Sequence, residues 1–173
     1  YPNLHFDFHG HNDYGLAVAN STAALTAGFN GIHTSVNGLG ERAGNTALST
    51  IVPCIHDHLD METTAQEITL NKISKIVETI SGIRVASNMP IIGENVFTQT
   101  AGVHADGDKK GNLYCNELMP ERFGRVRKYA LGKTSGKANI EKNLEELGLE
   151  LDAETKALIT AHVVELGDRK ESI

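Results

Sequence analysis

Two histidines two positions apart, His9 and His11, are the residues of this chain best suited to bind a metal. They stand at the end of a run, residues 4–10, whose alternation of side chains is typical of a β-strand. Successive side chains of a strand point to opposite faces, so both imidazoles lie on one face and can reach one divalent metal. Two imidazoles are an incomplete site, because a catalytic metal usually takes a third ligand, often a carboxylate. The alternative is a pair of surface or core histidines without a ligand.

A glycine-rich stretch, residues 37–45, is the second candidate for chemistry. Its three glycines permit tight turns and let a ligand approach the backbone closely. The stretch ends at Asn45, whose side chain offers one amide oxygen. Such loops are also common between strands and helices, where Asn45 would only cap the next helix.

The third candidate is His104, within Gly102-Val103-His104-Ala105-Asp106-Gly107. A histidine held between backbone turns can act as a general acid or base. Ten residues further on lies Tyr114. The alternatives are a surface histidine and a packed aromatic side chain. We assign the other five histidines to structure: His5, His33, His56, His58 and His162.

The elements that must position the first two candidates form one unit of strand, helix and strand. The pattern predicts a strand over residues 4–10, a helix over 13–28 and a strand over 31–36. This spacing is typical of two parallel strands joined by a right-handed crossover. A second helix is predicted over 46–59, with Pro53 as an irregularity.

The character of the chain changes near residue 66, which we take as a domain boundary between 1–65 and 66–173. A helix over 69–81, capped by Thr69, is predicted to bury one apolar face. That face comprises Ile73, Ile76, Val77 and Ile80. Residues 83–135 read as irregular. Two further helices are predicted over 137–147 and, capped by Asp152, over about 153–167, with inward residues Ile140, Leu144, Leu147, Leu158, Ile159, Val163 and Leu166.

The composition and charge of the chain argue against some classes of protein. The 173 residues carry a net charge of −6, which argues against a nucleic-acid-binding protein. The one basic cluster, between Arg122 and Lys128, is short and typical of a solvated face. Two cysteines without a C-x-x-C motif fit the reducing cytoplasm, and there is no apolar run near the roughly 18 residues of a membrane span. Because the chain starts without methionine, we expect it to be part of a longer protein.

The motifs together resemble one enzyme family. They read F-H-G-H-N-D-Y-G-L-A-V-A-N, then V-N-G-L-G-E-R-A-G-N, then G-V-H-A-D-G, with L-G-K-T-S-G-K-A-N further on. In this order they are similar to the 2-isopropylmalate, citramalate and homocitrate synthases, over essentially the whole chain. The segment from Gly107 to Ala138 looks closest to the isopropylmalate and citramalate branches.

The resemblance implies an α/β fold: the last strand–helix units of a TIM barrel, strands seven and eight, followed by a mostly helical linker subdomain. It implies that His9 and His11 are ligands of a catalytic divalent metal, with Asn45 at or near that metal. It further implies that His104 and Tyr114 belong to the linker of a homodimer and reach the active site of the partner subunit. His104 would help to activate acetyl-CoA, and Tyr114 would position the reacting groups.

The reaction that the resemblance implies is a Claisen condensation of acetyl-CoA with a 2-oxo acid, followed by release of CoA. The metal could be manganese, zinc or magnesium, and the 2-oxo acid is 3-methyl-2-oxobutanoate in the leading interpretation. Pyruvate, as in (R)-citramalate synthase, is the close alternative, and homocitrate synthase the more distant one. The resemblance gives no role to Asp13, Glu41 and Arg42, which match family positions near the site.

This chain lacks some of the motifs that the family carries. The family's first-strand motif, with an aspartate ligand and an arginine, is absent, as is the glutamate credited as part of the base. We therefore expect the isolated 173 residues to bind metal weakly and to be inactive. Two other interpretations are a lyase that cleaves an acyl-CoA and a non-catalytic dimerisation or regulatory module.

Overall fold

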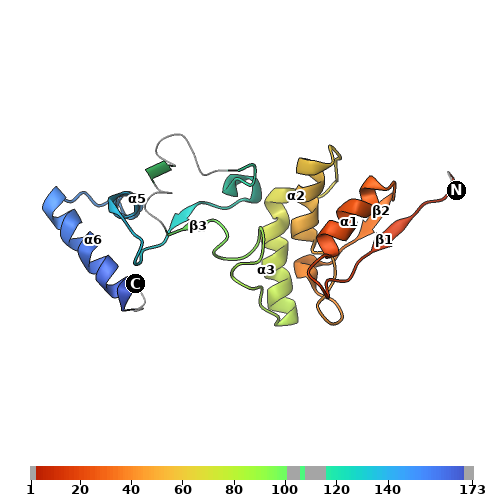
Figure 1. The fold of residues 1–173 in the computed structure, drawn as a ribbon, viewed down its shortest axis with the longest axis horizontal. Coiled ribbons are helices and arrows are strands. Elements are labelled where there is room, and N and C mark those ends of the chain that lie inside the picture. Colours follow the sequence, from red (N-terminus) through yellow and green to blue (C-terminus); the bar gives the residue numbers. More distant parts are fainter. Residues whose placement is uncertain (1–2, 101–105, 108–115, 170–173) are drawn as a thin grey trace. The chain divides into compact units, whose positions relative to one another are not determined.

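The structure is a computed structural model that describes residues 3–100, 106–107 and 116–169. It divides into two compact units, which are described separately (Figure 1). The first unit contains residues 1–96 and 121–124, and the second contains 97–120 and 125–173. Within the described ranges, no helix is both long and apolar enough to cross a membrane.

The first unit begins with the predicted strand–helix–strand unit. β1 (Asp7–His9) pairs in parallel with β2 (Gly31–His33), and α1 (Ala17–Thr26) connects them. Figure 1 shows α1 lying beside the two strands. Both strands are shorter than predicted, and α1 begins later because residues 13–16 form a turn rather than helix. The parallel pairing is confirmed.

The two faces of this strand pair differ in chemistry. On one face, the rings of Phe6 and Phe8 each lie 6.0 Å from the ring of Phe29, which follows α1. The opposite face carries His9 of β1 beside His33 of β2, the last pair of the register. The alternation read from the sequence therefore places the histidines away from the phenylalanine cluster.

After β2, the glycine-rich loop contains a short 3-10 helix, η1 (Val36–Gly38), and leads into α2 (Leu48–His58). Pro53 lies inside α2 and is buried, so the predicted irregularity does not end the helix. A second 3-10 helix, η2 (Glu67–Thr69), precedes α3 (Leu70–Ser81), which ends at Gly82. α3 packs against η1 and α2, so this compact unit continues past the predicted division after residue 65. The assignment of residues 66–173 to a linker subdomain stays a prediction.

The buried face of α3 is not the predicted one. Leu70, Ser74 and Glu78, four residues apart, are buried. Ile76 and Ile80 are instead 43% and 81% exposed. Helical spacing shows which side chains share a face, but a protein can bury a mixed face when its polar groups find partners.

Glu78 illustrates why this face can be buried. Its carboxylate accepts a hydrogen bond from Lys75 Nζ and another from the backbone N–H of Val85, each at 2.7 Å. These partners, Lys75 first, lower the pKa of Glu78. The predicted cap of the helix is also wrong, because the Thr69 hydroxyl donates to the Gln66 carbonyl instead of accepting from the helix.

The second unit has little strand. β3 (Thr98–Gln99) pairs in parallel with β4 (Lys128–Tyr129). A 3-10 turn, η3 (Pro120–Phe123), precedes β4 in the chain, but its residues from 121 on belong to the first unit. Two helices follow, α5 (Lys137–Leu147) and α6 (Ala153–Asp168), close to the predicted ranges.

α5 and α6 pack on each other around a small apolar core. Ile140 and Leu144 of α5 meet Val163 of α6 there. The predicted cap is confirmed, since Asp152 accepts a hydrogen bond of 2.8 Å from the Thr155 N–H. The inward placement of two other residues is wrong: Leu147 is 70% exposed and Leu158 is 67% exposed.

A pair of substitutions on α5 tests this core. We expect Leu144→Ala to lower the free energy of unfolding by about 2–4 kcal/mol, because it leaves a cavity beside Val163. Leu147→Ala, on the same helix, should change it by no more than about 0.5 kcal/mol. Urea unfolding measures both. Equal losses would contradict the described packing of α5 on α6.

Candidate metal centre

Two of the three predicted metal ligands are brought together by the backbone. Residues His11 and Asn45 form an isolated antiparallel bridge beyond the ends of β1 and β2. Next to it, the Thr46 N–H donates to the Gly10 carbonyl at 3.2 Å, and the Asn12 N–H donates to the Gly44 carbonyl at 2.9 Å. The segment after β1 and the end of the glycine-rich loop therefore hold each other in register.

The third predicted ligand lies next to them. The imidazole rings of His9 and His11 have their centroids 5.0 Å apart and are nearly perpendicular. The two rings thus stand on one face, as the strand alternation predicted. The His33 ring lies 5.7 Å from that of His9, from the neighbouring strand. Among the residues that the structure describes, no three His, Cys, Asp or Glu side chains are arranged to hold a metal ion.

The strongest sign of an available ligand set is a pair of buried polar atoms without partners. His11 Nδ1 and Asn45 Oδ1 are both buried and accept or donate no hydrogen bond within the described residues. Buried polar atoms are normally paired, so an unpaired one calls for an explanation. A nitrogen and an amide oxygen with free lone pairs are donors that a divalent metal accepts. The residues present fit such an ion.

Asn45 does not have the alternative role of a helix cap. α2 begins at Leu48, and its N-terminal flanking residue is Ala47. The Asn45 side chain instead donates from Nδ2 to the Leu39 carbonyl at 3.2 Å, which orients its oxygen. This amide packs so closely on Gly40 that a Cβ there would come within 2.5 Å of it. Gly40 is therefore needed for the position of Asn45.

An ion pair at the surface fixes the middle of the same loop. Arg42 donates from Nε and Nη2 to the two carboxylate oxygens of Asp13, both at 3.0 Å. This bonding lowers the pKa of Asp13 and raises that of Arg42. Arg42 has a positive φ of 56°, an uncommon conformation for a residue with a side chain. The pair gives Asp13 and Arg42, whose roles sequence reasoning left open, a part in shaping the loop.

Beneath the loop, two small hydroxyls link it to α1. Thr46 Oγ1 and Ser21 Oγ are both buried and lie 2.8 Å apart. Thr46 Oγ1 also donates to the Ala17 carbonyl at 3.4 Å. Sequence reasoning missed this pair, since a serine inside an Ala-rich helix and a threonine after an asparagine carry no signal of contact.

The remaining predicted site residues, His104 and Tyr114, lie outside the described residues. Their assignment stays a prediction. Of the histidines assigned to structure, His56 has such a role: Nδ1 lies 2.7 Å from Glu67 Oε1, and Nε2 lies 3.0 Å from Thr63 Oγ1.

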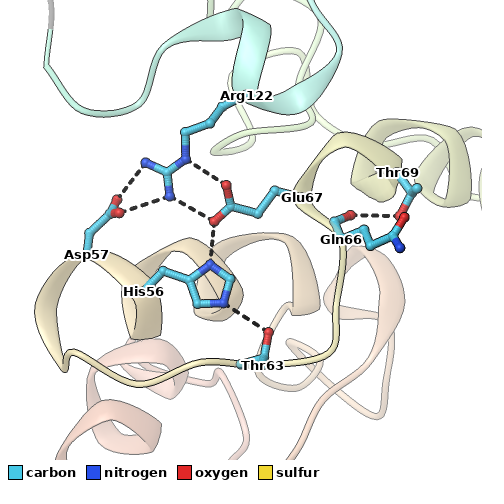
Figure 2. Close-up of polar contacts among 7 residues, drawn as sticks. All are labelled: His56, Asp57, Thr63, Gln66, Glu67, Thr69 and Arg122. Atoms are coloured by element: carbon cyan, nitrogen blue, oxygen red, sulfur yellow. Dashed lines mark hydrogen bonds and ion pairs between the residues drawn. The ribbon is translucent and has the colours of Figure 1, made fainter.

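Glu67 in turn binds an arginine that we predicted to be solvated. Arg122 donates to Glu67 from Nε at 2.6 Å and from Nη2 at 2.8 Å, and to Asp57 from Nη1 and Nη2 (Figure 2). The side chain of Arg122 is 26% exposed and those of both carboxylates 13%. The prediction of a solvated face is therefore wrong for Arg122.

Comparisons with known proteins agree with these motifs. Residues 2–80 match the HMGL-like family, and residues 91–171 match the homocitrate synthase post-HMGL domain-like family. The chain is similar to a protein of Methanopyrus kandleri named 2-isopropylmalate synthase, 43% identical over 162 residues, which are 93% of this chain and 32% of that protein. The chain belongs to the family of the 2-isopropylmalate, citramalate and homocitrate synthases.

Family members with different names are about equally similar. An (R)-citramalate synthase homologue of M. kandleri is 39% identical over 95% of this chain and 32% of its own length. A homocitrate synthase of Saccharolobus islandicus is 42% identical over 91% of this chain and 34% of its own length. The chain thus spans about a third of the curated relatives it matches. Identity by itself does not choose among the three synthases.

A glycine substitution tests the geometry of the loop. Gly44 has a φ of +87°, and a Cβ there would lie 2.0 Å from the Gly38 carbonyl oxygen. We expect Gly44→Ala to lower the free energy of unfolding by about 2 kcal/mol or more, through strain and this clash. Gly28→Ala is the matched control, because Gly28 also has a positive φ but open space around it, so it should cost about half as much. Denaturant unfolding distinguishes them, and equal losses would contradict the close approach.

The dependence of the free energy of unfolding on pH, in the acid range, tests the hydrogen bonds of Glu67. Arg122 first and His56 second lower the pKa of Glu67 below its ordinary value of 4.5. The ionised carboxylate therefore contributes stability in full above pH 4.5 and loses it as the pH falls through the lowered pKa. We expect Glu67→Gln to cost on the order of 1–3 kcal/mol at pH 7, and this cost to shrink below pH 4.5.

Urea unfolding of both proteins between pH 3 and pH 8 measures that difference. Glu62→Gln is the control, because Glu62 is an exposed carboxylate in the preceding loop. A cost for Glu67→Gln that stays constant down to pH 3 would show that its carboxylate is not bonded as described.

Proposed function

We propose that this chain is the carboxyl-terminal part of an acyltransferase that condenses acetyl-CoA with 3-methyl-2-oxobutanoate, a 2-isopropylmalate synthase-type enzyme. The observation that carries the proposal is the bridge between His11 and Asn45, which leaves His11 Nδ1 and Asn45 Oδ1 buried and unpaired. Membership of a family whose relatives are named for such condensations supports it.

In the whole enzyme, β1 and β2 would be the last two strands of a TIM barrel. Parallel strands with a helix between them are the repeating unit of such a barrel, and barrel enzymes place their chemistry at the carboxyl ends of the strands. His11 and Asn45 follow the carboxyl ends of β1 and β2. Residues 66–173 would be a linker subdomain that takes part in a homodimer.

His9, His11 and Asn45 would hold a divalent metal, manganese, zinc or magnesium. When bound, such a cation would supply Lewis acidity toward the carbonyl oxygen of the 2-oxo acid. Asn45 is oriented for this by its bond to the Leu39 carbonyl. Two imidazoles and one amide leave the carboxylate ligand to a part of the enzyme outside this chain.

His104 and Tyr114 would complete the site in the homodimer. The proposed role of His104 is to help remove a proton from the methyl carbon of acetyl-CoA, as a general base or its relay. Tyr114 would hold the reacting groups in position through its hydroxyl. Attack of the resulting carbanion on the keto carbon forms the new carbon–carbon bond, and hydrolysis of the thioester then releases CoA.

Two other condensation reactions are alternatives to this one. The same residues would serve an (R)-citramalate synthase acting on pyruvate or, as a more distant choice, a homocitrate synthase. The choice of 2-oxo acid would depend mainly on strands outside this chain. A lyase or a regulatory module would have no need of His9, His11, Asn45, His104 and Tyr114 together.

Release of CoA thiol by the whole enzyme tests the proposal. The substrates are acetyl-CoA with pyruvate, 3-methyl-2-oxobutanoate or 2-oxoglutarate, with and without a divalent metal and a chelator. We expect metal-dependent release with 3-methyl-2-oxobutanoate, and a loss on the order of 10²–10⁴-fold in His104→Ala.

His162→Ala is the matched control, because His162 is an exposed histidine of α6 and should leave the rate unchanged. Release with pyruvate alone would make the enzyme a citramalate synthase. No release with any of the three acids would overturn the condensation.

A further inference from the structure

A cavity of about 330 Å³ lies between the glycine-rich loop and the segment that follows α3. One wall is formed by loop residues 37–40 and 42–44, and the other by residues 83–86 and Met89. All of these residues belong to the first unit, so the cavity lies within that unit alone. Its volume is at the lower end of the range typical of ligand pockets and suits part of an elongated ligand.

Hydrogen bonds to α3 hold both walls of the cavity. From the loop, Asn37 Nδ2 donates to the Ser74 carbonyl of α3 at 3.2 Å. From the other wall, the Val85 N–H donates to the buried carboxylate of Glu78, also on α3, at 2.7 Å. The shape of the cavity is therefore set by the fold of the first unit.

The charged residues that line the cavity are all positive. They are Arg42 and Arg84, and none of the lining residues, all of which the structure describes, is acidic. Arg42 is neutralised, because both carboxylate oxygens of Asp13 accept its hydrogen bonds. Arg84 is exposed, and its side chain forms no hydrogen bond or ion pair within the described residues. The carboxylate of Glu78, which is attracted by Arg84, is hydrogen-bonded to Lys75 instead. One guanidinium thus remains available to an anion.

The cavity adjoins the candidate metal centre at Gly40. This residue lines the cavity, and a Cβ at its position would come within 2.5 Å of the Asn45 amide. The cavity and the candidate metal ligand Asn45 therefore contact the same glycine. A ligand in the cavity can have one end beside Asn45 and a second, charged end at Arg84.

The rest of the lining is mainly apolar. Besides glycine, alanine and Asn37, it comprises Leu39, Ile83, Val85 and Met89. Such walls favour a ligand with an uncharged stretch that can leave water. Of the two substrates of the proposed reaction, the 2-oxo acid is short and would lie on the metal. Only acetyl-CoA carries phosphate groups at a distance from its reacting carbon, on an uncharged pantetheine arm.

We propose that this cavity binds the pantetheine arm of acetyl-CoA and that Arg84 pairs with a phosphate of the same molecule. The inference rests on the proposed function, which supplies acetyl-CoA as a substrate. The Arg84 guanidinium donates charge-assisted hydrogen bonds to the phosphate oxygens, and the arm replaces water along the apolar wall. The thioester then reaches the metal centre past Gly40.

A substrate without phosphate tests the role of Arg84 in the whole enzyme. We expect Arg84→Gln to lower kcat/KM for acetyl-CoA about 5–20-fold, through a raised KM, because a charge-assisted pair is lost. For acetyl-pantetheine, which has no phosphate, kcat/KM should stay within about twofold, as should the KM for the 2-oxo acid and the Kd for the metal. Equal losses with both thioesters, or a raised KM for the 2-oxo acid, would overturn the inference.

Three further variants complete this design. Lys72→Gln removes an exposed cation of α3 that does not line the cavity, so it should match the wild type. Arg84→Lys should recover part of the loss, because an ammonium also binds phosphate, though only as a point charge. Ala86→Phe fills part of the cavity without a change of charge, so it should lower kcat/KM for both thioesters. Unchanged values in Ala86→Phe would overturn the course of the arm through the cavity.

Calorimetric titration of CoA into the whole enzyme tests the site without turnover. In Arg84→Gln the Kd for CoA should rise about 5–20-fold, whereas the urea midpoint should not change, because Arg84 is exposed and unpaired. An unchanged Kd would overturn the inference even in an active enzyme. An enzyme that binds CoA through Arg84 but releases no CoA thiol from acetyl-CoA with any 2-oxo acid would overturn the proposed condensation and leave the binding site standing.

Discussion

The structure of the first unit depends on one backbone constraint, the parallel register of β1 and β2 and its continuation past their ends. The register pairs His9 with His33, and the bridge between His11 and Asn45 extends it into the loops. Parallel pairing requires a crossover, which α1 provides, and Phe29 just after α1 packs on Phe8 of β1. The opposite face then carries the imidazoles. A slip of one residue would turn His9 of β1, and His11 beyond its end, to the phenylalanine face, so the same bonds determine fold and site.

A series of close contacts extends this constraint through the glycine-rich loop to α2. Gly40 and Gly44 let the chain pass close to the Asn45 amide and the Gly38 carbonyl. The Asp13–Arg42 pair holds the loop from outside, and the buried hydroxyls of Ser21 and Thr46 hold it from beneath. Each of these contacts either satisfies a polar group or removes a clash. Several buried polar atoms of the described residues have no hydrogen-bond partner, Ser35 Oγ and Asn37 Oδ1 of the same loop among them. Two of these atoms, His11 Nδ1 and Asn45 Oδ1, lie on residues joined by the bridge and are those that a metal would use.

Much of this arrangement was predictable because it depends on local periodicity. Side chains alternate between the two faces of a strand, which predicted that His9 and His11 share one face. The strand–helix–strand spacing predicted the parallel pairing of β1 with β2. The apolar face of α3 could not be predicted in the same way. Periodicity grouped its isoleucines but does not tell which face a neighbour covers, and buried Glu78 depends on Lys75 and on the Val85 N–H.

The role of Arg122 was hidden for a related reason, since its two carboxylate partners are 55 and 65 residues away in the chain. Such long-range pairs leave no periodic trace in a single sequence. In contrast, Asp152 was identified as a cap because its partner Thr155 is only three residues away. Sequence reasoning was therefore reliable where cause and effect are local, and wrong where a distant segment decides which group is buried.

The central claim is that His9, His11 and Asn45 form the protein part of a metal site. The most direct measurement is a crystal structure of the whole enzyme grown with manganese, with anomalous diffraction recorded on both sides of the manganese absorption edge. The account predicts an anomalous peak about 2.0–2.3 Å from an imidazole nitrogen of each histidine and beside Asn45 Oδ1. A manganese peak elsewhere, with His11 Nδ1 and Asn45 Oδ1 bonded to other groups, would contradict it.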